Sequence, residues 1–201
     1  MYTATVVATV VLMFIGAVDY VRRAWKKETN PVPATWVLMV TTMGLSFWMY
    51  QMNPNKTWTG NIGVTAALLN TTIILVGVVA LNVRHGTLKV AFDRVQRICM
   101  TGGFVIVLFW YFTNQPLIAY LLVQAIALFA YGATVRRLWR SERSTEPYFL
   151  WLSVLFGNFC AFYPAWVRND VFSWIYLGRS TPSTLIIIWL IWRIKNRMHQ
   201  K

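Results

Sequence analysis

The chain has 201 residues, of which 57% are apolar and only 12% are charged. Globular domains carry about a quarter charged residues, so this chain lacks the charged surface that a soluble protein needs. Nineteen residues are Lys or Arg and six are Asp or Glu, which gives a net charge of +13. The charges come in short clusters between long uncharged runs. This distribution excludes a soluble nucleic-acid-binding protein and a disordered chain, and it predicts a polytopic membrane protein.

Seven apolar runs have about the length that a helix needs to cross a hydrocarbon core of ~30 Å. The fourth run is the shortest. Its separation from the fifth rests on Asn114-Gln115-Pro116, because proline cannot continue a helix but suits its first turn. We therefore predict an all-α integral membrane protein with seven transmembrane helices. The runs cover residues 3–20, 34–51, 60–83, 98–113, 116–135, 148–167 and 171–193.

Lys and Arg alternate between the segments that flank these runs. In chain order the segments carry 0, 4, 1, 4, 0, 4, 1 and 4 basic residues. Basic segments stay on the cytoplasmic side, so the alternation predicts an N-terminus outside and a C-terminus inside. We expect the bacterial cytoplasmic (inner) membrane. Arg179, inside the seventh run, is the one basic residue that this topology does not explain.

The first and fifth connecting segments share a motif that indicates an internal duplication. Residues 21–36 (VRRAWKKETNPVPATW) and 135–151 (VRRLWRSERSTEPYFLW) share Val-Arg-Arg-x-Trp, a Thr-x-Pro turn and a Trp entering the next helix. Recurrent interfacial anchoring is the alternative, but it would not reproduce the spacing. Trp36 and Trp151, matched in this way, are expected to anchor the cytoplasmic ends.

Both motif segments are expected on the same side, so the repeats run parallel. We predict two parallel three-helix repeats joined by a linker helix, a 3+1+3 arrangement. Two parallel bundles facing each other can enclose a polar site at the midplane, which three helices alone cannot. The predicted parts are the first repeat (1–83), a cytoplasmic loop with the linker helix (84–115), and the second repeat with a cytoplasmic tail (116–201).

A set of residues in the second repeat carries a family resemblance. It comprises Trp139-x-Ser141-Glu142-Arg143, Pro147, Trp151, Ser153, Gly157, Tyr163, Asp170-Val171-Phe172 and Gly178. The set resembles the LAB-N domain, named after the N-terminus of some lipid A biosynthesis proteins and grouped with the PQ-loop folds. The 3+1+3 arrangement likewise resembles the PQ-loop superfamily of SWEET sugar transporters and KDEL receptors.

The Pro-Gln dipeptide of that superfamily is absent here. The corresponding pairs are about Val18-Asp19 and Thr134-Val135. The resemblance implies a transporter-like fold, and SWEET-like pockets use an asparagine on the third helix of a repeat. That implication singles out Asn70 as a substrate-binding residue.

Arg179 is the leading candidate for a functional residue on its own chemistry. It lies nine residues after Asp170, so we expect it about 13 Å deep, close to the bilayer midplane. An ionisable residue there is costly and normally faces a cavity or a partner. Water, backbone carbonyls or an anionic ligand could meet its charge, and the alternative is an arginine that snorkels outward.

The residues around Arg179 suggest an opening in the helix. Pro182 removes a backbone donor and frees the carbonyl of Gly178. We therefore predict a polar, interrupted helix with a hinge at Pro182, the expected sign of a transport site. Trp174, about one turn before Arg179, is expected to line an outer vestibule where aromatic faces stack on sugar or base rings.

Three further polar residues lie within predicted spans. Asn70 and Asn158 are mid-span and must find partners, either on a neighbouring helix or in a solute. Asp19 precedes Arg22 and Arg23 by three and four residues. That spacing favours a structural ion pair, and a proton-coupling role is the alternative.

These features lead to two function hypotheses. The first is a transporter that moves a small polar solute by alternating access between two pseudo-symmetric bundles, at a site of Arg179, Asn70 and Asn158. The uncompensated arginine favours an anionic group on the solute. The second is a non-transporting membrane module or subunit that binds lipid or a lipid-linked sugar in envelope biosynthesis.

Other classes lack their motifs. Cys99 and Cys160 show no metal-ligand spacing, and the sequence contains no nucleotide-binding loop, Ser/His/Asp set or HExxH motif. We expect no enzymatic activity, no cofactor, no metal and no nucleic-acid partner. The expected partners are a small-molecule solute and membrane lipid, and an oligomer is compatible with the sequence.

Overall fold

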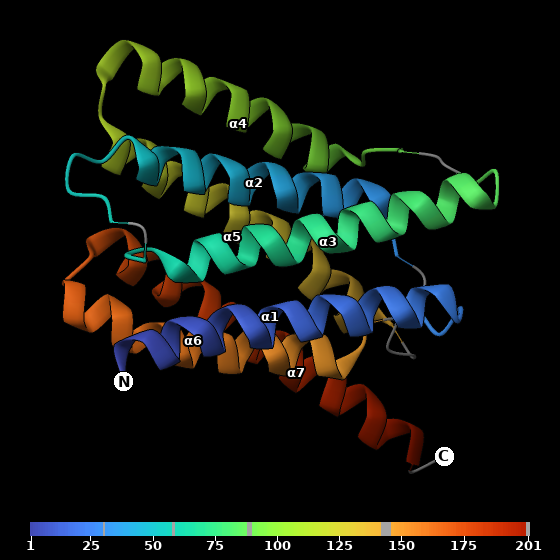
Figure 1. Ribbon diagram of the computed structural model, residues 1–201. Coiled ribbons are helices and arrows are strands. Elements are labelled where there is room, and N and C mark those ends of the chain that lie inside the picture. The colour runs from blue at the N-terminus through green and yellow to red at the C-terminus, as the bar shows by residue number, and fades with distance from the viewer. Residues whose placement is uncertain (30, 58, 88–89, 142–145, 200–201) are drawn as a thin grey trace.

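The described part of the chain forms seven α-helices (Figure 1). The computed structural model describes residues 1–29, 31–57, 59–87, 90–141 and 146–199, and these ranges contain no β-strand. The prediction of an all-α protein is therefore confirmed for the part of the chain described. The helices are α1 (Tyr2–Trp25), α2 (Pro33–Gln51), α3 (Ile62–Arg84), α4 (Arg94–Thr113), α5 (Pro116–Arg140), α6 (Tyr148–Arg168) and α7 (Val171–His199).

Five of these helices are long and apolar enough to cross a membrane: α1, α3, α4, α5 and α6. α2 and α7 are long enough as well, but Thr, Trp and Tyr in α2 and the stretch around Arg179 in α7 make them less apolar. Large apolar side chains such as Phe104, Phe112 and Phe129 are exposed on the outside, where a bilayer would cover them. The chain has the properties of an integral membrane protein.

Local signals account for the ends of α4. Asp93 and Gln96 form a capping box, in which the Asp93 carboxylate accepts from the Gln96 backbone N–H at 2.7 Å. The Gln96 side chain accepts from the Asp93 N–H at 3.0 Å in return. This cap starts the helix at Arg94, before the predicted residue 98. The helix ends at Thr113, its C-cap Asn114 is left-handed with φ of 50°, and Pro116 opens α5, which confirms the predicted break.

The packing of the helices repeats itself. α3 packs against both α1 and α2, and α7 packs against both α5 and α6. We call α1–α3 the first group and α5–α7 the second group. Between the groups, α1 packs on α6 and α2 packs on α5. If α1 is exchanged with α5, α2 with α6 and α3 with α7, each of these contacts is replaced by another of them: α1–α3 by α5–α7, α2–α3 by α6–α7, and α1–α6 by α2–α5. The remaining helix, α4, lies outside the two groups against α5 and α2 (Figure 1).

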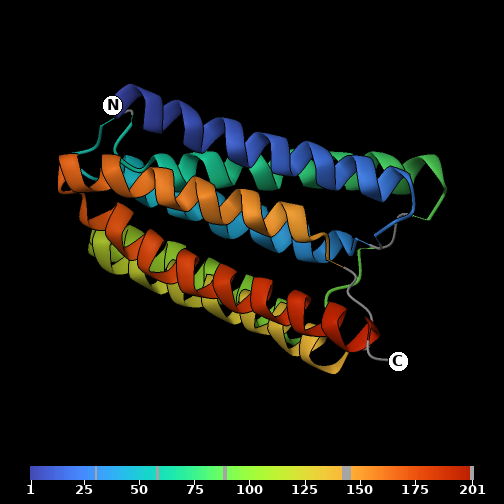
Figure 2. The ribbon, with the colours of Figure 1, turned by 90° about the horizontal axis from the view of Figure 1, so that it is seen from below.

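The basic segments gather at one end of the molecule, which we call the basic end. The C-terminal ends of α1, α3, α5 and α7 lie there together with the N-terminal ends of α2, α4 and α6, on the right in Figures 1 and 2. The connections at the opposite end carry Lys56 and Arg168. The basic residues in the described segments of the basic end are Arg22, Arg23, Lys26, Lys27, Arg84, Arg94, Arg97, Arg136, Arg137, Arg140, Arg193, Lys195 and Arg197.

The contact between α1 and α6 joins the two groups closely. A Cβ added at Gly16 of α1 would lie 2.8 Å from the Cβ of Ser153 on α6. On the other side, a Cβ at Gly157 of α6 would lie 3.0 Å from the Met13 side chain. The Thr9 hydroxyl donates to the Gly157 carbonyl at 3.4 Å. Small residues let membrane helices approach in this way, so this contact depends on glycine at both positions.

We predict that Gly16→Ala lowers the thermal unfolding temperature of the detergent-purified protein, because the new methyl group overlaps the Ser153 Cβ. Overpacking of this kind costs about 1–3 kcal/mol. Gly132→Ala on α5 is the matched control, since a Cβ there meets nothing within 4 Å, and it should leave stability unchanged or raise it by up to about 1 kcal/mol. Equal unfolding temperatures for the two variants would contradict the close α1–α6 contact.

Candidate functional site

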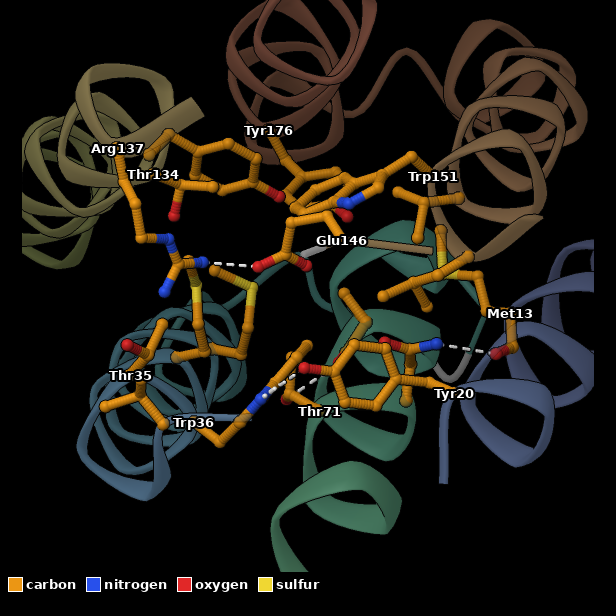
Figure 3. A pocket seen from close by; sticks show the side chains of 18 residues that line it. Met13, Tyr20, Thr35, Trp36, Thr71, Thr134, Arg137, Glu146, Trp151 and Tyr176 are labelled. Atoms are coloured by element: carbon orange, nitrogen blue, oxygen red, sulfur yellow. Dashed lines mark hydrogen bonds and ion pairs between the residues drawn. The ribbon is translucent and has the colours of Figure 1, made fainter. Parts of the chain in front are cut away.

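A narrow cavity lies between the first and second groups (Figure 3). Residues of all six helices in the two groups line it, and so do Val32 and Glu146 from the segments that lead into α2 and α6. Its volume is about 50 Å³. A single water needs roughly 10–15 Å³ measured in this way, so the cavity as it stands has room for a few waters and is closed to a larger solute.

The tryptophans of the repeated motif form facing walls of this cavity. Trp36 donates its indole N–H to the Tyr20 hydroxyl at 3.3 Å, and the two rings meet edge to face at 4.9 Å. Trp151 meets Tyr131 edge to face at 5.9 Å. In each case the tyrosine comes from the preceding helix, α1 or α5. The expectation that Trp36 and Trp151 are interfacial anchors is wrong, because they are only 8% and 6% exposed and pack between the groups.

A buried carboxylate pairs with an arginine at the cavity. Arg137, near the end of α5, donates Nη2–H to Glu146 Oε1. The Glu146 side chain is 8% exposed, whereas Arg137 is 39% exposed. Figure 3 shows the Glu146 carboxylate reaching toward Arg137 beneath the rings of Trp151 and Tyr176. Burial raises the pKa of Glu146, and the nearby Arg137 guanidinium and Trp151 indole oppose this effect only in part.

Asn70 is the one predicted site residue that lines the cavity. It lies on α3 and donates its amide N–H to the Met13 carbonyl of α1 at 2.6 Å. Asn158 is fully buried outside the cavity lining and donates to the Ser180 hydroxyl at 3.0 Å, which links α6 to α7. Both amides therefore bond to a neighbouring helix, and of the two Asn70 alone also lines the cavity.

Arg179 lies behind the cavity wall. Its Nε–H donates to the side-chain oxygen Oε1 of Gln124 on α5 at 2.8 Å, and the Gln124 side-chain Nε2–H donates to the Ser46 hydroxyl of α2 at 2.8 Å. The guanidinium carbon is 5.1 Å from the Tyr131 ring centre and 5.3 Å from that of Tyr176, and both rings line the cavity. Its buried Nη1 has no hydrogen-bond partner among the described residues. An amide and two aromatic faces thus meet the charge.

α7 is continuous from Val171 to His199 and includes Pro182 within the helix. The predicted interruption is therefore wrong for this structure, while a hinge at Pro182 stays a prediction. Serine and threonine neighbours help transmembrane helices tolerate proline, and here the Ser183 hydroxyl donates to the Arg179 carbonyl at 2.8 Å. Trp174 contacts Phe162 and Trp166 of α6 on the outer surface and is outside the cavity lining.

Asp19 pairs within its own helix. Its carboxylate accepts from Arg23 Nε at 2.7 Å, which confirms the structural ion pair, and a proton-coupling role remains a prediction. No group of three or more His, Cys, Asp or Glu side chains that could hold a metal occurs in the part of the chain that the structure describes.

The two charged side chains that line the cavity, Arg137 and Glu146, are not among the site residues predicted from the sequence. In the sequence, Arg137 is one of four basic residues of a segment predicted to be cytoplasmic, and Glu146 lies in a predicted turn. The available signal is the repeat itself: the Thr-x-Pro turn has Glu146 in its second copy and Asn30 in its first. A difference inside an otherwise matched motif could have marked the position.

We predict that Glu146→Gln changes the pH dependence of stability. Burial makes the folded protein favour the protonated form of Glu146, so the pKa of this group is higher in the folded than in the unfolded protein. Its contribution to stability is fully present below the ordinary pKa of 4.5 and is lost as pH rises through the raised pKa. The neutral glutamine variant should therefore unfold at the same temperature as the unmodified protein below the ordinary pKa, and at a higher temperature above the raised one. Thermal unfolding across a pH series measures this difference, and a difference that does not change with pH would contradict it.

No family model, no curated protein and no solved structure matches this chain.

Proposed function

We propose that this protein is a membrane transporter that moves a small polar solute by alternating access between its first and second groups of helices. In this proposal α1–α3 and α5–α7 are the two three-helix repeats and α4 is the linker, the 3+1+3 layout of the PQ-loop type. The observation that carries the proposal is the cavity between the groups, because it receives side chains from every helix of both. A site at the interface of two repeats is what transport by rocking requires.

The repeated packing supports this proposal. The contacts within each group interchange when the groups are exchanged, and so do the α1–α6 and α2–α5 contacts between them. The matched tryptophans follow the same exchange, since Trp36 and Trp151 both line the cavity and each meets a tyrosine of the preceding helix edge to face, although the two tyrosines are at unmatched positions. Two similar halves around one cavity can close at either end by equivalent movements.

The side chains around the cavity favour a particular kind of solute. Tyr and Trp rings can stack on a sugar or another flat ring, and Asn70 offers an amide from α3. Two guanidinium groups, Arg137 at the cavity and Arg179 behind its wall, outnumber the one carboxylate in the cavity lining, Glu146. This excess of positive charge favours a solute that carries an anionic group.

The charge distribution also supports an orientation. The basic end carries most of the Lys and Arg, and basic segments stay in the cytoplasm. The N-terminus would then face outward and the C-terminus inward, in the cytoplasmic membrane of a bacterium. The cavity is lined by Arg137 from the C-terminal end of α5, so it lies toward the cytoplasmic side in this orientation.

A second function is favoured by one observation. α6 exposes Phe156, Phe159 and Trp166, a row of aromatic side chains on which a lipid or lipid-linked sugar could lie. The chain would then be a non-transporting module or subunit of envelope biosynthesis. Lipid extraction from purified protein followed by mass spectrometry, together with the absence of uptake for every solute tried, would favour this function over transport.

We predict that Asn70→Ala reduces solute uptake by reconstituted vesicles at least about tenfold, the effect of losing roughly 1.4 kcal/mol of binding. The assay measures labelled neutral sugars and sugar acids in parallel. Asn82→Ala is the matched control on the same helix, because Asn82 donates to the Val78 carbonyl of its own helix at 2.8 Å and lies outside the cavity lining. Equal uptake by both variants would remove Asn70 from the site.

We also predict that Arg179→Ala abolishes uptake without lowering the yield of folded protein, because the cavity loses one of its two nearby positive charges. Arg168→Ala, at the exposed opposite end, is the control and should transport normally. Uptake by Arg179→Ala at the rate of the unmodified protein would show that this arginine plays no part in transport.

A further inference from the structure

A second hollow adjoins the cavity at the basic end. It has a volume of about 300 Å³ and lies between α2, the start of α4 and α5. We call it the vestibule. Gln96 of α4 lines it and donates to the Thr35 hydroxyl of α2 at 3.2 Å, so α4 forms part of its wall. Four residues line both the vestibule and the cavity: Val32, Thr35, Thr134 and Arg137.

Arg137 is the only charged side chain among these four, and it connects the two spaces. It is 39% exposed and faces the vestibule, while its Nη2–H bonds to the buried carboxylate in the cavity. A solute that moves between the vestibule and the cavity therefore passes this guanidinium. Glu146 occupies it in the closed state described here.

We propose that Arg137 is the binding site for a carboxylate group on the solute, and that Glu146 holds this site closed until it takes up a proton. This inference rests on the proposed transport function and adds the chemical class of the solute and the coupled ion. In the closed state Glu146 stands in for the carboxylate of the solute. Protonation removes its negative charge and leaves the arginine to an incoming carboxylate.

The geometry of the pair suits such an exchange. A guanidinium presents a planar fork of donors that matches a carboxylate, and the resulting bond is stronger than one to a neutral acceptor. A protonated Glu146 can offer only a neutral acceptor, so a carboxylate from the solute would displace it. Because one proton and one carboxylate enter together, the site gains no net charge, which matters in a water-poor interior.

Among the titratable side chains around the ion pair, Glu146 is the one whose protonation controls the net charge of the cavity. Arg137 and Tyr131 of α5, Tyr20 of α1 and Tyr176 of α7 are the other titratable side chains in the cavity lining. On the vestibule side, Asp93 at the N-cap of α4 is a second carboxylate in the lining, and it accepts from the Gln96 backbone N–H. The lining residues of α2, α3 and α6 are all neutral. Burial raises the pKa of Glu146, which favours its protonated form.

The same coupling works in both directions. A solute that binds Arg137 removes the partner of the ionised Glu146 and so favours its protonated form. Linkage requires that protonation strengthen solute binding by the same factor. Solute and proton then load the site as a pair.

The test is the access of charged thiol reagents to a cysteine in the cavity. Thr71 on α3 lines the cavity and bonds only to carbonyls of its own helix, so Thr71→Cys is a mild change. The background carries Cys99→Ala and Cys160→Ala. The probes are anionic sulfonatoethyl methanethiosulfonate and cationic trimethylammonioethyl methanethiosulfonate, and the readout is the ratio of their labelling rates at one pH.

We predict that Glu146→Gln in this background raises the anionic-to-cationic rate ratio at least about tenfold, the lower end of electrostatic effects on association rates. Adding Arg137→Gln should remove the rise. Equal acceleration of both reagents would overturn the proposal, because glutamine has nearly the size of glutamate and the ion pair with Arg137 would then close the entrance to either charge alike. An unchanged ratio would overturn it as well.

A second measurement avoids any change at Glu146. With the native glutamate, the same rate ratio should rise as pH falls, while the Glu146→Gln ratio stays flat. The ratio cancels the ionisation of the thiol, which affects both reagents alike. A ratio independent of pH in both proteins would contradict proton control. Labelling of the cysteine does not require transport, so the two proposals can fail separately. The expected labelling without any uptake would refute the transport function alone. Uptake without the expected labelling would refute this inference alone.

Discussion

The structure depends on a carboxylate buried between two groups of membrane helices. Glu146 lies in a cavity where its charge cannot be fully hydrated, and Arg137 is the cation that meets it. Removing Arg137 would leave the Glu146 carboxylate without its cation in a poorly polarisable interior, whereas the guanidinium of Arg137 is itself 39% exposed. The ion pair therefore connects the state of the cavity to the protonation of one residue.

The proposed duplication accounts for a cavity between two similar groups of helices, and a difference between the two motif segments accounts for its charge. The second arginine of each Val-Arg-Arg motif is Arg23 in one copy and Arg137 in the other. Arg23 pairs with Asp19 on its own helix and with Glu28 just beyond it, outside the cavity. Arg137 pairs instead with Glu146 inside the cavity. Equivalent positions of one scaffold thus serve a structural ion pair in the first group and an internal one in the second.

Much of the fold could be predicted from the sequence, because apolar runs and helix-capping residues are local signals. The break at Asn114 and Pro116 is present, and the Asp19–Arg23 pair follows from its spacing. Contacts between distant helices leave no such signal. The bond from Arg179 to Gln124 joins residues 55 apart in sequence, so a lone arginine in an apolar run could be identified but its partner could not.

Two other differences between the predicted and the observed structure also come from contacts between distant helices. Trp36 and Trp151 have the residue type and position of interfacial anchors, but only the packing of the two groups shows that they face inward. Pro182 predicts a broken helix from its own chemistry, whereas α7 remains continuous in its tertiary environment. Local chemistry therefore indicates which residues are unusual, and the packing decides what they contact.

Transport by alternating access requires that the two groups move relative to each other and open the cavity at one end at a time. Spin–spin distances in lipid nanodiscs test this most directly, with one exposed label on each group. Val83 of α3 and Trp192 of α7 report on the basic end, and Val7 of α1 and Leu117 of α5 report on the opposite end. The account predicts two distance populations at each end, which shift in opposite directions as pH is lowered. A single distance at both ends, unchanged by pH, would contradict it.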